Sequence, residues 1–97
     1  MKVSVLIPLY NAEKYIARTL ESVIRQTYKD FEIVVIDDCG TDSSVDIVKE
    51  FQKKDSRIKI IHNDKNRGIA YSRNRGIDLS EGKYIALLDD DDVMTER

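Results

Sequence analysis

The sequence predicts an α/β protein with a mostly parallel sheet of about four strands and three helices, in a Rossmann-like three-layer arrangement. Three observations support this prediction. Short apolar runs rich in β-branched residues alternate with segments of helical periodicity. Nearly every position in these runs is apolar, as expected for strands that are covered on both faces. A polar cluster follows each run, where a parallel strand would end.

The predicted strands cover residues 3–7, 31–36, 58–61 and 84–88. The first predicted helix has one apolar face, formed at helical spacing by Ala12, Ile16, Leu20, Val23 and Ile24. Asn11 precedes this pattern and is its expected N-cap. In the second helix, the corresponding face is formed by Val45, Val48 and Phe51.

Asp42 precedes this second helix and is a candidate cap. The third helix has a weaker pattern. Its expected face is partly polar and comprises Ala70, Arg73, Asn74 and Ile77. Gly76 interrupts this segment and lowers its helix propensity.

Composition excludes several classes of protein. The 97 residues fit one small domain, and a net charge of −2 with scattered Lys and Arg gives no nucleic-acid footprint. Cys39 is the single cysteine, so no internal disulfide can form, which favours a reducing compartment. No apolar run approaches the roughly 18 residues of a membrane span, and the start does not resemble a signal peptide. We therefore expect a cytoplasmic chain.

The polar clusters after the strands are expected to meet at one edge of the sheet. Ligands bind at this edge in open parallel sheets, where the strand order reverses. A strand order of 3-2-1-4 would open a crevice between the first and fourth strands. That crevice would gather Tyr10, Asp38 and the run from Asp89 to Asp92.

The acidic run has two explanations on spacing alone. Asp89 and Asp91 would share one side of an extended segment, and Mg²⁺ or Mn²⁺ takes such carboxylate oxygens together with phosphates. The alternative is an acidic turn exposed to solvent. On position alone, Tyr10 is more often a half-buried core or rim residue than a ligand contact. Asp38 is open between a ligand contact and a helix cap or turn position. No zinc pairing for His62, nucleophile elbow or phosphate-binding loop is present in the sequence.

Four motifs together resemble a known family. They are VSVLIPLYN at residues 3–11, VVIDDCGTD at 34–42, NRGIAYSRNRGI at 66–77 and GKYIALLDDDD at 82–92. In this order and spacing they resemble the nucleotide-sugar-binding half of glycosyltransferase family 2, whose members are inverting enzymes of GT-A fold. The resemblance covers residues 1–97, and it is far more specific than any one motif.

The resemblance implies a role for particular residues. Asp38 matches the aspartate that accepts a hydrogen bond from the uracil of a UDP-sugar, and Pro8 and Tyr10 match residues that border the base. Glu13 would help to shape that pocket. Asp89 and Asp91 match the Asp-x-Asp motif, in which the first residue lies near ribose and metal and the second ligates Mg²⁺ or Mn²⁺. Two further residues match a segment near the nucleotide, namely Arg73 and Asn74.

The sequence departs from the family pattern at two places. Cys39-Gly40 stands where Gly-Ser is more frequent, which could alter the turn after the second strand. The acidic run is also longer than usual, so Asp90 or Asp92 is an alternative metal ligand.

The resemblance implies that an acceptor hydroxyl attacks the anomeric carbon while the nucleoside diphosphate leaves. The catalytic base of the family lies downstream of the Asp-x-Asp motif, hence beyond Arg97. We therefore interpret the chain as a donor-binding part, truncated at the C-terminus and inactive alone. The acceptor would be a glycan or a lipid-linked glycan, and the sequence does not identify it further. The inner face of the membrane is an alternative location for the full-length protein. Self-association of the fragment is plausible, because missing strands would leave apolar surface exposed.

Two alternatives remain at this point. A haloacid-dehalogenase-type phosphohydrolase would use Asp89 as nucleophile and Asp91 as acid, but that motif usually follows the first strand of its domain. A non-catalytic module could bind nucleotide or metal in the same crevice.

Overall fold

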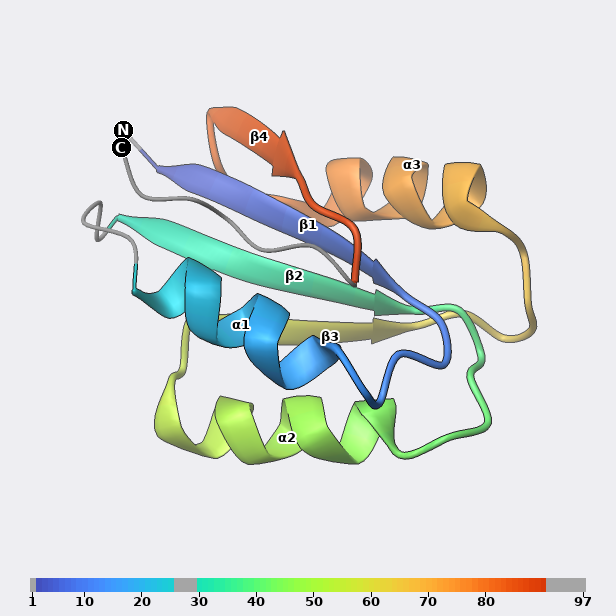
Figure 1. Cartoon of the computed structure of the whole chain (residues 1–97). Coiled ribbons are helices and arrows are strands. Elements are labelled where there is room, and N and C mark those ends of the chain that lie inside the picture. Colours follow the sequence, from blue (N-terminus) through green and yellow to red (C-terminus); the bar gives the residue numbers. More distant parts are fainter. Residues whose placement is uncertain (1, 26–29, 91–97) are drawn as a thin grey trace.

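The computed structural model describes residues 2–25 and 30–90. These residues form a parallel sheet with helices on both faces (Figure 1). The elements are β1 (Val3–Leu9), α1 (Ile16–Ile24), β2 (Phe31–Asp37), α2 (Ser44–Lys54), β3 (Ile58–His62), α3 (Ile69–Leu79) and β4 (Tyr84–Leu87). The strand order β3-β2-β1-β4 is the predicted one. The fold class predicted from the sequence is therefore confirmed.

The two faces of the sheet carry unequal cores. The larger core lies between the sheet and α1 with α2, where Ile16, Leu20 and Val48 are fully buried. The smaller core, on the α3 side, consists of Leu6, Val34 and Ile36, with Ile61 packed against them. Because alternate residues of β1 and β2 serve opposite cores, both strands are apolar at nearly every position.

The predicted cap of the first helix is wrong. α1 begins at Ile16, and Tyr15 occupies its cap position. Asn11 has a φ of 48°, in the left-handed region that Asn tolerates better than most residues. Its Oδ1 accepts hydrogen bonds from the backbone N–H groups of Thr41 at 2.7 Å and Asp42 at 3.2 Å. Asn11 thus joins the loop after β1 to the loop after β2.

The predicted cap of the second helix, Asp42, is one residue too early. α2 begins at Ser44, with Ser43 in the cap position. Asp42 lies one residue earlier, and its Oδ1 accepts the backbone N–H of Ser44 at 2.9 Å. Asp42 therefore satisfies a free donor of the first helical turn, which is the physical task of a cap.

The predicted buried face of α3 is wrong. Ser72 and Gly76 face the sheet, whereas Ala70, Asn74 and Ile77 are exposed. The reason is close packing, because a Cβ at Gly76 would lie 2.8 Å from Ile36 Cδ1 and 3.3 Å from Leu6 Cδ1. Only small residues fit this contact, so the apolar pattern of α3 points to the wrong face. No helix in the described ranges is long and apolar enough to cross a membrane.

Candidate functional site

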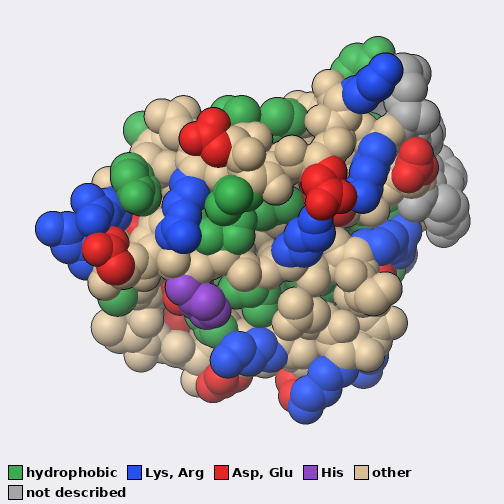
Figure 2. Space-filling model, turned by 180° about the vertical axis from the view of Figure 1, so that it is seen from behind, with side chains coloured by type: hydrophobic (Ala, Val, Ile, Leu, Met, Phe, Trp, Pro, Cys, Tyr) green, Lys and Arg blue, Asp and Glu red, His purple; other side chains and the backbone are tan. Residues whose placement is uncertain are grey.

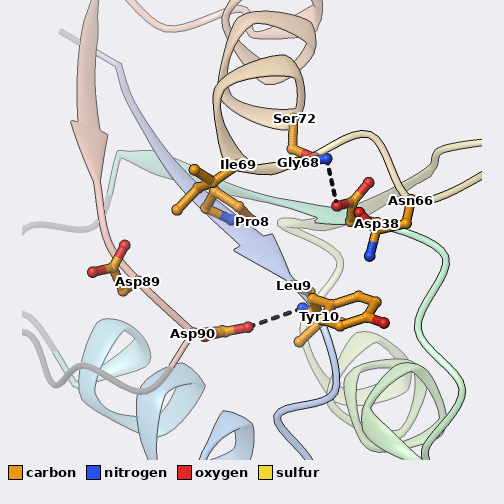
Figure 3. Close-up of a pocket in the computed structure, with 10 residues that line it drawn as sticks. All are labelled: Pro8, Leu9, Tyr10, Asp38, Asn66, Gly68, Ile69, Ser72, Asp89 and Asp90. Carbon is orange, nitrogen blue, oxygen red and sulfur yellow. Dashed lines mark hydrogen bonds between the residues drawn. The ribbon is translucent and has the colours of Figure 1, made fainter.

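A pocket of about 430 Å³ opens at the carboxyl ends of β1 and β2 (Figure 3). The start of α3 and the segment after β4 complete its walls. The lining residues are Pro8, Leu9, Tyr10, Asp38, Asn66, Gly68, Ile69, Ser72, Asp89 and Asp90. The strand order therefore brings Pro8, Tyr10, Asp38 and Asp89 together, as the sequence predicted for this edge of the sheet.

Asp38 is a buried carboxylate that accepts three hydrogen bonds. Its Oδ1 accepts from Asn63 Nδ2 at 2.8 Å and from the backbone N–H of Arg67 at 2.7 Å. Its Oδ2 accepts from the backbone N–H of Gly68 at 2.9 Å. Burial raises the pKa of Asp38, but these three donors outweigh it and hold the pKa below its ordinary value. The carboxylate is therefore charged at neutral pH.

Among the described residues, the Asp38 carboxylate has partners for all but one of its acceptor positions. Two carboxylate oxygens offer about four acceptor positions, of which three are occupied here. The remaining one is on Oδ2, the oxygen that receives a single donor. Because the three donors fix the orientation of the carboxylate, the direction of the unused lone pair is fixed as well.

The loop between β3 and α3 and the first turn of α3 supply pocket residues that the sequence analysis missed. Asn66, Gly68, Ile69 and Ser72 all line the pocket. Gly68 has a φ of 91°, a conformation that favours glycine. The side chain of Asn63 bridges Asp38 and Ser72 Oγ, the latter at 2.9 Å. The one signal in the sequence for this loop was the motif at residues 66–77, within which the resemblance matched only Arg73 and Asn74 to a segment near the nucleotide.

Asp90 is bound to the end of β1 and not free in the pocket. Its Oδ2 accepts the backbone N–H of Tyr10 at 2.9 Å (Figure 3), and its backbone oxygen accepts from Thr19 Oγ1 at 3.0 Å. Asp89 lies apart from this contact, with its Oδ1 3.4 Å from a guanidinium nitrogen of Arg73 and its side chain 48% exposed. Of the two carboxylates, Asp89 is the one open to a ligand.

Some predicted site residues lie away from the pocket surface. Glu13 is exposed, and its backbone N–H donates to Asp42 Oδ2 at 3.1 Å. Asn74 is exposed on α3. Arg73 does not line the pocket, although it lies beside Asp89. Asp91 and Asp92 lie outside the described residues.

Residues 4–97 match the family model described as "Glycosyl transferase family 2". The chain belongs to this family. Among its family 2 relatives is the glycosyltransferase GlyG of Streptococcus pneumoniae serotype 4, which is 37% identical over 94 residues. That match covers 97% of this chain and 31% of GlyG. The chain thus spans about a third of the length of this relative.

Solved structures of similar proteins have the same GT-A fold. S. aureus TarS residues 1–349 in complex with UDP-GlcNAc has a TM-score of 0.88 and 37% identity, covering 94% of this chain and 27% of that one. The mannosyltransferase PcManGT of Pyrobaculum calidifontis, in complex with GDP-Man and Mn²⁺, has a TM-score of 0.87 and 25% identity. This match covers 92% of the present chain and 27% of the PcManGT chain.

The described acidic residues fit a divalent ion that is shared with a ligand. Within residues 2–25 and 30–90, no group of three or more His, Cys, Asp or Glu side chains could hold a metal on its own. Mg²⁺, however, is commonly held by one or two carboxylates plus phosphate oxygens. The exposed Asp89 carboxylate at the pocket edge offers hard oxygen donors of this kind.

Proposed function

We propose that this chain binds the donor, a nucleotide-sugar and most readily a UDP-sugar, for a family 2 glycosyltransferase. In the whole protein, the sugar would pass to an acceptor with inversion at the anomeric carbon. The observation that carries the proposal is the buried, charged Asp38 carboxylate, which shares one pocket with Pro8, Tyr10 and Asp89. The likeness to TarS, described in complex with UDP-GlcNAc, supports the same choice of donor.

The unused acceptor position of Asp38 suits the base of uridine. Uracil presents an N–H between its two carbonyl groups, and this group would donate to Asp38 Oδ2. Cytosine has no N–H at that position, so it would place a lone pair against a carboxylate. Tyr10, whose side chain is 47% exposed at the mouth of the pocket, and Pro8 would border the ring.

The diphosphate would lie toward the segment after β4. We propose that Asp89 and Asp91 hold Mg²⁺ or Mn²⁺ there. Such an ion would neutralise the charge that develops on the leaving diphosphate. Arg73, beside Asp89, would keep that carboxylate oriented toward the pocket edge. The catalytic base and the acceptor site are proposed to lie in other segments of the whole protein, on the cytoplasmic side of the membrane.

Titration calorimetry of the chain with UDP, in the presence and absence of Mn²⁺, tests this function. We expect UDP to bind without metal and to bind more tightly with Mn²⁺, whereas CDP should bind much more weakly. Asp38→Asn should weaken UDP binding about tenfold or more under both conditions, because a hydrogen bond to a charged group contributes about 1.5–3 kcal/mol. Asp91→Asn should remove only the gain from Mn²⁺.

Asp64→Asn is the matched control. Asp64 is an exposed carboxylate in the same loop, and its side chain pairs with Arg67 at 3.0 Å. This variant should bind UDP as the wild type does. Equal binding of UDP and CDP, or no binding of either, would contradict the proposed donor site.

A further inference from the structure

Glu32 is a buried carboxylate at the opposite end of β2 from the pocket. It is 2% exposed, although it lies in a strand whose other positions are mostly apolar. In the register of the sheet, Glu32 lies beside Ser4 of β1, and both are on the α3 side together with Lys59 of β3. Glu32 is about 20 Å from Asp38 along the strand. The proposed donor binding therefore does not require a charged group at this position.

The contacts of Glu32 connect three strands with the turn before β4. Its Oε2 accepts from Ser4 Oγ at 2.6 Å and from the backbone N–H of Glu81 at 2.7 Å. Ser4 Oγ in turn accepts the backbone N–H of Gly82 at 2.8 Å. On the other side, Lys59 Nζ lies 2.9 Å from Glu32 Oε1. Through these bonds, β3, β2 and β1 are connected to the turn that starts β4.

Two carboxylates near the ends of β2 therefore bind the chain on either side of α3. Asp38 binds the backbone of Arg67 and Gly68 where α3 begins. Glu32 binds Glu81, directly before β4. The segment between these points contains α3, and β4 follows it (Figure 1).

The turn held by Glu32 also sets where β4 starts along β1. A Cβ at Gly82 would lie 2.6 Å from the backbone nitrogen of Ser4 and 3.0 Å from the backbone oxygen of Lys2, so the chain approaches β1 as closely as glycine allows. The backbone N–H of Lys83 then donates to Lys2 O at 2.9 Å. β4 pairs with β1 over four residues only. A slip of one residue would turn Asp89 to the other side of the strand.

We propose that Glu32 is a positioning residue for metal-dependent donor binding, which it supports by fixing the register of β4 along β1 and thereby the position of Asp89. This inference rests on the proposed function. Glu32 touches neither nucleotide nor metal in this proposal, and it acts only through Ser4, Glu81 and Gly82.

The test compares two readouts in Glu32→Gln. Metal-free UDP affinity should stay within about twofold of the wild type, because Asp38 is remote from the change. The additional affinity given by Mn²⁺ should fall about tenfold, the size of effect typical for residues that orient metal ligands. Amide hydrogen exchange should become faster at residues 84–87 and stay unchanged at residues 67–70.

Val48→Ala is the control for a general loss of stability. Val48 is fully buried in α2, on the other face of the sheet. This variant should lower the melting temperature and leave the gain from Mn²⁺ unchanged. Should Glu32→Gln fail to fold, Ser4→Ala removes the link to Gly82 while Glu32 keeps its pairing with Lys59, and it should show the same selective loss.

The outcomes separate this inference from the proposed function. If Mn²⁺ does not increase the UDP affinity of the wild-type chain, the metal-dependent donor site is contradicted. If amide hydrogen exchange at residues 84–87 is unchanged in Glu32→Gln, the inference about Glu32 is overturned independently. A Glu32→Gln variant that retains the full gain from Mn²⁺ would also overturn it, with the proposed donor site intact.

Discussion

At the scale of single residues, the loop after β2 holds an unusual backbone conformation next to the pocket. Cys39 has a φ of 60°, in the left-handed region, and follows Asp38 directly. Gly40 lies in the next position, where a Cβ would be 2.9 Å from Asn11 Oδ1 and 3.3 Å from Asn11 N. The family pattern of Gly-Ser differs from this sequence at both positions. Cys39 thus occupies the conformation for which glycine is better suited.

We expect Cys39→Gly to stabilise the chain by about 0.5 kcal/mol, because relief of the left-handed conformation exceeds the entropy that glycine adds to the unfolded chain. Gly40→Ala should destabilise it by about 1–3 kcal/mol, because the new Cβ would displace Asn11 from its bonds to Thr41 and Asp42. Urea unfolding measures both changes. A loss of stability in Cys39→Gly would show that the cysteine side chain contributes more than its backbone conformation costs.

The sequence revealed the residues at strand ends better than those in loops. Pro8, Tyr10, Asp38 and Asp89 could be placed at one edge because βαβ connectivity makes the strands parallel, so that their carboxyl ends meet there. Asn63 and Ser72, by contrast, depend on how the β3–α3 loop folds around Asp38. Hydrogen bonds to backbone N–H groups, such as that of Gly68, leave no periodic pattern in a sequence.

At the scale of elements, α3 shows why hydrophobic periodicity can mislead. α3 packs through small side chains, because Ser72 and Gly76 allow its backbone to approach β1 and β2 closely. α1, in contrast, buries large apolar side chains and follows its predicted face. Hydrophobic periodicity therefore identified the buried face of α1, which carries large apolar side chains. It missed the buried face of α3, which carries small residues.

The β2 strand also contains a charge whose contribution depends on pH. Burial raises the pKa of Glu32, but hydrogen bonds from Lys59, Ser4 and the Glu81 backbone outweigh it and lower the pKa from 4.5 to about 2. A depressed pKa stabilises the fold above the unfolded value of 4.5, and this contribution is lost as pH falls toward 2. The difference corresponds to about 3 kcal/mol.

Urea unfolding of the wild type and Glu32→Gln over a pH series should show this loss. The gap in unfolding free energy between the two proteins should be constant above about pH 5 and should narrow by up to about 3 kcal/mol toward pH 2. Glu50→Gln, which removes an exposed carboxylate paired with Lys53 at 3.0 Å, should show no such narrowing. A gap that does not change with pH would mean that folding leaves the pKa of Glu32 at its unfolded value.

At the scale of the whole molecule, the β4 side of the sheet is incompletely covered. Among the described residues β4 is an edge strand, and Tyr84, Ile85 and Leu87 are 54%, 40% and 50% exposed. Ile85 and Leu87 are in register with Ser4 and Leu6, hence on the α3 side, but α3 packs against β1 and β2. Viewed from behind, the surface shows hydrophobic side chains among the charged ones (Figure 2).

An exposed apolar edge strand is a template for pairing with another chain. We therefore expect the 97-residue chain to self-associate through β4 as its concentration rises. Burying one half-exposed side chain of this size contributes about 1 kcal/mol, so Leu87→Lys should weaken association about fivefold or more. Sedimentation velocity over a wide range of concentration measures the effect.

Tyr15→Lys is the matched control for the same experiment. Tyr15 is 48% exposed at the start of α1, on the other face of the sheet, and the substitution adds the same charge. If β4 is the contact, only Leu87→Lys should shift the chain toward monomer, because lysine at an edge strand opposes pairing both by its charge and by its hydration. Equal shifts in the two variants would assign the association to net charge, and a monomeric wild type at every concentration would show that the β4 edge is too short to pair.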